Sequence, residues 1–167
     1  QAQFLLPVAT AATRKRISEI LAQTEFAYLP ITLTDKQSDT VCTAADVVLV
    51  TSGTATLEVA LCKRPMVISY KISPLTYAYV KRKIKVPHVG LPNILLGKAA
   101  VPELLQHDAV PEKLAQAVAD WYDHPEAVAA LEQDFHALHL LLKKDTAALA
   151  AAAVLEEAGF SDGLKDK

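Results

Sequence analysis

Short apolar runs alternate with segments of helical periodicity along the first seventy residues of the chain. The apolar runs predict strands at residues 3–8, 27–31, 46–50 and 66–70. The run 46–50 does not alternate with polar residues, which favours a strand buried on both faces. Apolar positions at helical spacing predict helices over residues 13–24, 38–45 and 54–63. Because strand, helix and strand follow one another directly, we expect an α/β, Rossmann-like fold with a mostly parallel sheet flanked by helices.

Helical patterns dominate the chain after residue 73. Ser73 and Pro74 are typical of a helix start, and this helix is expected to run to about Lys85. Residues 86–93, with two prolines, predict a loop. Further helices are predicted over residues 101–107, 111–123, 126–142 and 147–158.

The last two predicted helices carry more apolar surface than the rest of the chain is expected to cover. We therefore expect an α/β domain over residues 1–125 and helices over residues 126–158 that are exposed or pack on another domain or a partner chain. Residues 159–167 are expected to form a flexible tail.

Composition narrows the class of protein. The chain has 167 residues, of which 51% are hydrophobic and 6% aromatic, and its formal net charge is −2. Few aromatics favour helices packed on a sheet, and the charge argues against a generic nucleic-acid binder. Cys42 and Cys62 lack the spacing of metal ligands and are typical of small buried residues in a reducing compartment. Because a core strand is predicted from residue 3 with nothing before it, we expect a fragment of a longer protein.

A strand, turn and helix between Asp46 and Glu58 form the most informative local pattern. The first N–H groups of a helix have no acceptor within the helix, and with the helix dipole they form an anion site that phosphate commonly occupies. Gly53 would allow close approach of a ligand to the backbone. Glu58, one turn further on, could accept from a sugar hydroxyl. The hydroxyls near the turn are additional donors: Ser52, Thr54 and Thr56.

The same residues admit a simpler interpretation. Ser and Thr are preferred N-caps, and a Glu near a helix start is stabilised by the dipole without any ligand. However, ligands in parallel α/β sheets bind beyond the C-terminal ends of the strands, and the turn at Gly53 falls at such an end. This position favours a binding site for a nucleotide diphosphate.

Several further motifs follow this turn in a fixed order. They are residues 52–58 (SGTATLE), 63–67 (KRPMV), Tyr70-Lys71, Lys81-Arg82, 91–93 (LPN) and 101–106 (VPELLQ). Over roughly residues 43–142 this series resembles the lipid-A-disaccharide synthases, which are GT-B glycosyltransferases with two Rossmann-like domains facing across a cleft. The resemblance implies that the chain is most of the C-terminal, donor-nucleotide half of a GT-B fold, with extra C-terminal helices.

The resemblance also implies an activity for the full enzyme. Such enzymes transfer 2,3-diacylglucosamine from UDP-2,3-diacylglucosamine to 2,3-diacylglucosamine 1-phosphate, invert the anomeric carbon and release UDP. They require no metal and no other cofactor to hold the diphosphate. Their general base belongs to the N-terminal domain, so no catalytic residue is expected in this chain. We therefore expect the chain alone to fold without catalysing transfer.

The family's donor-nucleotide site carries over onto matching positions of this sequence. The residues that would face the UDP phosphates are Ser52, Gly53, Thr54 and Ala55. Glu58 would accept from the ribose hydroxyls. Asn93 would contact the donor or shape its pocket.

A basic segment suggests a second contact surface, made by Lys81, Arg82, Lys83 and Lys85. Such a segment can be an ordinary solvated face, or it can bind anionic lipid head groups or the acceptor phosphate. The family's lipid substrates favour the second interpretation. The resemblance further implies a peripheral enzyme on the cytoplasmic face of a Gram-negative inner membrane, and a homodimer with exchanged C-terminal helices.

Two other classes of function remain open from the sequence. One is another UDP-sugar enzyme of GT-B type, such as the peptidoglycan N-acetylglucosaminyltransferase or a UDP-N-acetylglucosamine epimerase, although the LPN motif after a basic helix argues against both. The other is a non-catalytic nucleotide-binding module. Such a module would be indicated if changes at Gly53 or Glu58 left nucleotide binding unchanged.

Overall fold

The computed structural model describes residues 2–23, 25–83 and 87–159. Its strands run parallel to one another in two sheets, one ordered β1-β2 and one ordered β3-β4-β5. The strands are β1 (Phe4–Val8), β2 (Ile31–Asp35), β3 (Val48–Thr51), β4 (Met66–Tyr70) and β5 (Glu103–Leu105). The α/β, Rossmann-like prediction is therefore confirmed.

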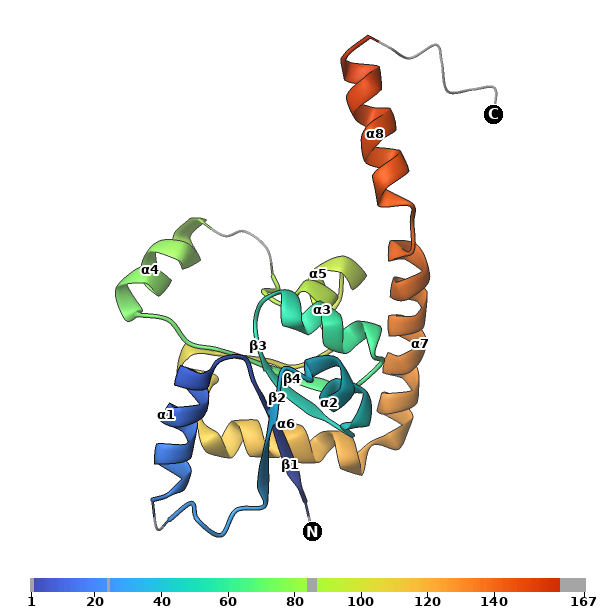
Figure 1. Cartoon of the computed structure of the whole chain (residues 1–167). Helices are drawn as coiled ribbons and strands as arrows, with labels where there is room; N and C mark the ends of the chain where they lie inside the picture. The colour runs from blue at the N-terminus through green and yellow to red at the C-terminus, as the bar shows by residue number, and fades with distance from the viewer. Residues whose placement is uncertain (1, 24, 84–86, 160–167) are drawn as a thin grey trace.

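Helices connect and flank these strands (Figure 1). The helices of the α/β part are α1 (Ala11–Leu21), α2 (Ser38–Ala44), α3 (Thr54–Leu61), α4 (Pro74–Lys83) and α5 (Leu91–Leu96). A 3₁₀ turn, η1 (Gln106–Asp108), follows β5. The remaining helices are α6 (Pro111–Asp123), α7 (Pro125–Leu142) and α8 (Thr146–Glu157). In Figure 1, α3 and α5 lie on one side of β3 and β4, and α6 lies on the other.

Three segments differ from the sequence prediction. The strand predicted at residues 27–31 begins only at Ile31, because residues 25–29 form turns. Pro30 has no N–H, so it contributes to the sheet only through its carbonyl, which accepts from the Phe4 N–H at 2.9 Å. The helix predicted over residues 101–107 is β5 followed by η1. The predicted LPN loop is the start of α5, where Pro92 stands at one of the first helical positions.

The core lies between β4 and the helices α3 and α7. Its fully buried apolar side chains include Met66, Ile68, Val59, Leu131 and Phe135. Trp121 packs at its border and donates its indole N–H to the Met66 carbonyl at 3.2 Å. Leu131, Phe135 and Leu138 belong to α7, so this helix is part of the core of the chain itself, although the sequence prediction places it outside the α/β domain.

The strands β1 and β3 are more exposed than their apolar sequences predict. Val48 and Val50 of β3 pack against the core, but Leu49, on the opposite face, is 54% exposed. Phe4, at the start of β1, is 52% exposed. The prediction that β3 is buried on both faces is therefore wrong for this chain, since within the described residues only one of its faces is covered.

Helix α8 extends away from the rest of the molecule (Figure 1). Asp145 caps its N-terminus by accepting from the Ala148 N–H at 3.0 Å. All of its side chains are exposed, and Val154 is 67% exposed. Within the described ranges, the structure contains no helix that combines the length and the apolar character needed to cross a membrane.

Candidate functional site

The turn between β3 and α3 has the geometry of an open helix N-terminus. Gly53 is the N-cap residue of α3, with φ 152° and ψ −166°, and it provides no side chain to cap the helix. A Cβ built on Gly53 would have no atom within 4 Å, so the space in front of this residue is open. Of the first three N–H groups of α3, that of Thr56 donates to the Gly53 carbonyl at 3.2 Å, which leaves those of Thr54 and Ala55 without an acceptor within the helix. A phosphate could therefore approach the backbone here without displacing any side chain.

The predicted phosphate and ribose residues divide into two groups. Thr54, Ala55 and Glu58 are exposed on the first two turns of α3. In contrast, Thr56 is fully buried, and its hydroxyl donates to the Gly53 carbonyl at 2.7 Å. Ser52 is half-buried, and its hydroxyl donates to the Val89 carbonyl at 3.0 Å. Thr56 therefore fixes the turn from inside, and Ser52 ties it to the segment before α5.

The parallel sheet brings three strand ends to one edge. Thr51 pairs with Ser69, and Tyr70 pairs with Leu105, so β3, β4 and β5 end at similar heights. The turn at Gly53 leaves this edge, which is the position where parallel α/β sheets bind ligands. The placement expected from the sequence for the SGT turn is thus the observed one.

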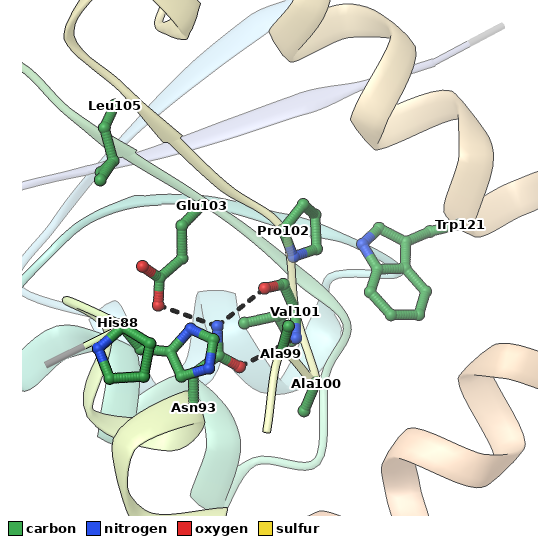
Figure 2. Close-up of a pocket in the computed structure, with 10 residues that line it drawn as sticks. His88, Asn93, Ala99, Ala100, Val101, Pro102, Glu103, Leu105 and Trp121 are labelled. Carbon is green, nitrogen blue, oxygen red and sulfur yellow. Dashed lines mark hydrogen bonds between the residues drawn. The ribbon is translucent and has the colours of Figure 1, made fainter. Parts of the chain in front are cut away.

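Asn93 lies inside the molecule, with no exposed surface. Its side-chain amide donates to the Val101 carbonyl at 2.8 Å and to a Glu103 carboxylate oxygen at 2.8 Å. Its amide oxygen accepts from the Val101 N–H at 3.0 Å. Both amide hydrogens therefore have protein acceptors, as Figure 2 shows. Of the two roles expected for Asn93, this geometry supports shaping the pocket over direct contact with the donor.

Glu103, on β5, is a residue of the site that the sequence reasoning did not single out. Its carboxylate accepts from the N–H groups of Val89 and Gly90, each at 2.9 Å, in addition to the Asn93 amide. The available signal was an acid within the otherwise apolar run from Val101 to Leu105. Its partners lie 10 to 14 positions away, so no helical or strand period indicates the contact.

Gln106 is a second residue that the sequence reasoning did not single out. It is 7% exposed and has a positive φ of 51°, which is uncommon for a residue other than glycine. With its amide oriented to satisfy both partners, it donates to the Ile72 carbonyl at 3.0 Å and accepts from the Ile72 N–H at 3.2 Å. Gln106 therefore holds the segment that follows β4 against the end of β5.

A shallow hollow of about 510 Å³ lies beside this network. Figure 2 shows His88, Asn93 and Glu103 at one part of its wall and Trp121 at another. Apolar and small residues complete it, mainly from the segment before β5. The hollow follows the outer edge of β5, and the exposed turn at Gly53 does not line it.

The predicted basic surface is only partly described. Arg82 is exposed on α4. Lys81 and Lys83 belong to the same helix, but their side chains lie outside the described part of the structure, as does the whole of Lys85.

The environment of Cys42 lowers the reactivity of its thiol. Burial raises the pKa of the Cys42 thiol, and the neighbouring Cys62 and Glu58 raise it further. This thiol is therefore protonated at neutral pH and a poor nucleophile.

Among the described residues, no three His, Cys, Asp or Glu side chains come together in a group that could hold a metal ion.

Comparison with known proteins places the chain in a family. A family model described as lipid-A-disaccharide synthetase matches residues 1–157. A lipid-A-disaccharide synthase of Neisseria meningitidis serogroup A is 82% identical over 158 residues, which are 95% of this chain and 41% of that relative. Another, of Chromobacterium violaceum, is 56% identical over 95% of this chain and 41% of its own length. The chain thus spans about 41% of the length of these relatives, and it belongs to the lipid-A-disaccharide synthetase family.

Proposed function

We propose that this chain is the donor-nucleotide part of a lipid A biosynthesis glycosyltransferase. The full enzyme would transfer 2,3-diacylglucosamine from UDP-2,3-diacylglucosamine to 2,3-diacylglucosamine 1-phosphate. Family membership supports this reaction class, and the relatives carry the name lipid-A-disaccharide synthase. Because the chain spans about 41% of their length, we assign the general base and the acceptor site to the remainder of the full-length protein.

The observation that carries this proposal is the uncapped N-terminus of α3 beside Gly53. In the proposed reaction the acceptor hydroxyl attacks the anomeric carbon from the face opposite the leaving group, which inverts that carbon. The bond to the diphosphate breaks, and negative charge grows on the departing UDP. Helix N–H groups and the helix dipole would stabilise this charge in place of a metal ion. Glu58, exposed one turn further on, would accept from the ribose hydroxyls.

Titration of the isotope-labelled chain with UDP, followed by two-dimensional NMR, tests the donor site. We expect amide shifts concentrated at residues 52–58, with smaller shifts near Asn93, and no comparable shifts with AMP. The reason is that the site is proposed to recognise a uridine diphosphate through the turn and its first helical N–H groups. An absence of shifts at millimolar UDP, both here and in a full-length relative, would contradict the nucleotide assignment.

We also propose that α4 contacts anionic groups at the membrane surface, as a peripheral enzyme acting on acylated sugars requires. The exposed Arg82 and its three neighbouring lysines support this contact. Reversing all four charges to Glu should abolish most binding to phosphatidylglycerol vesicles at low salt, because each basic residue near an anionic surface contributes about 1 kcal/mol. Reversing four basic residues that are exposed elsewhere, Lys15 and Arg16 on α1 and Lys143 and Lys144 after α7, provides the matched control. Equal vesicle binding by wild type and the α4 variant would refute the proposal.

A further inference from the structure

The backbone of Val89 forms hydrogen bonds with two side chains, one directly after β3 and one on β5. Its carbonyl accepts from the Ser52 hydroxyl at 3.0 Å, directly after β3. Its N–H donates to the Glu103 carboxylate at 2.9 Å, on β5. These two contacts join the SGT turn to the start of α5 through one peptide segment.

Glu103 is the centre of this junction. Its two oxygens accept three hydrogen bonds, from the N–H groups of Val89 and Gly90 and from the Asn93 amide. None of the ion pairs formed by the described residues includes Glu103. Its charge is therefore stabilised by N–H donors, and such charge-assisted hydrogen bonds are stronger than neutral ones. A carboxylate suits this position because both of its oxygens accept, whereas a glutamine amide has only one oxygen and would turn its NH2 group toward one of the two backbone N–H groups.

The packing around Gly90 leaves room for this carboxylate and little else. A Cβ on Gly90 would lie 3.0 Å from a Glu103 oxygen and 2.3 Å from the Ile68 side chain. Glu103 thus occupies the N–H groups that precede α5, while the N-terminus of α3 stays open.

We propose that Glu103 is a positioning residue of the donor site, which fixes the segment from Val89 to Asn93 against the turn at Ser52. It acts through these residues and does not touch the nucleotide. This inference rests on the proposed function, since it assigns a role to a residue behind the same donor site.

The test compares Glu103→Gln with wild type in the full-length protein. We expect the KM for UDP-2,3-diacylglucosamine and the Kd for UDP to rise about tenfold, with kcat reduced less than threefold, because binding geometry is lost and the chemical groups remain. Glu112→Gln, an exposed carboxylate in the first turn of α6, is the matched control and should leave all three values unchanged. Glu103→Asp keeps the charge and should give intermediate values, which keeps the test usable if the Gln variant does not fold.

A double-mutant cycle in UDP affinity distinguishes the positioning role from a role in folding alone. Ser52→Ala and Glu103→Gln should be non-additive in UDP affinity, because both act through Val89. Unchanged UDP affinity in folded Glu103→Gln or Glu103→Asp, with wild type binding UDP normally, would overturn the positioning role alone. Failure of wild type to bind UDP would overturn the proposed function and this inference together.

Discussion

We expect Gly53→Val to lower the kcat/KM of the proposed full-length transferase about 100-fold, the loss typical of removing one backbone site for developing negative charge. Two physical effects combine. The φ of 152° is unfavourable for a β-branched residue, so the turn must shift. The new side chain also enters the open space before α3, where the UDP phosphates are proposed to lie. Steady-state kinetics and UDP titration measure the effect.

Gly97→Val is the matched control for this prediction. Gly97 follows α5 with φ 66°, and a Cβ there also has no atom within 4 Å. Both variants therefore bring comparable backbone strain, about 1–3 kcal/mol, but only one lies at the proposed phosphate site. Activity within threefold of wild type is expected for Gly97→Val. An equal loss in both variants would attribute the Gly53 effect to stability and not to binding.

Phe135→Ala is expected to produce the largest loss of stability, about 3–5 kcal/mol in the free energy of unfolding. Phe135 has no exposed surface and lies in the core cluster with Met66 and Ile68 of β4. Truncation leaves a cavity that the surrounding strand and helices cannot fill completely. Since domains are stable by only about 5–15 kcal/mol, the variant should unfold at much lower urea concentration.

Leu140→Ala on the same helix is the control for this measurement. Leu140 is 59% exposed, so its truncation should change the unfolding free energy by less than about 0.5 kcal/mol. Urea denaturation followed by circular dichroism compares the two variants. A loss below about 1 kcal/mol for Phe135→Ala would mean that α7 is not part of this core and belongs with another domain or chain.

The two C-terminal helices, α7 and α8, therefore differ in how far their side chains are buried. Helix α7 contributes buried side chains to the α/β part, whereas α8 is exposed along its length. We propose that α8, and not α7, packs on the remainder of the full-length protein or on a partner chain. The apolar Leu149, Val154 and Leu155 are the side chains that such a contact would cover.

Sequence patterns located the helices and strands best where the signal is local. The run before Gly53 and the helical pattern after it correspond to β3 and α3, and the anion-site geometry follows from their junction. Patterns failed at β5 and at α5. The three residues of β5 are too few to show the alternation of a strand. They form a strand because this segment is hydrogen-bonded to β4, where the Ile68 N–H donates to the Pro102 carbonyl at 2.9 Å.

These failures fall on the segments that build the inner part of the site. Glu103 belongs to β5, and Asn93 belongs to α5. Their partners are fixed by contacts between elements, which no window of the sequence contains. The resemblance pointed to Asn93 as a site residue, but only the structure shows its amide committed to Val101 and Glu103.

The sequence by itself determined the order of elements from β1 to β4, the α/β class, the family and the open turn at Gly53, because hydrophobic periodicity, glycine conformation and helix-end chemistry act over a few residues. The tertiary structure alone decided that Thr56 points inward, that α7 joins the core, and that Glu103 joins the turn after β3 to α5. The physical reason is distance along the chain: burial and hydrogen bonding depend on which remote segments meet, and that is settled only when the strands pair and the helices pack upon them.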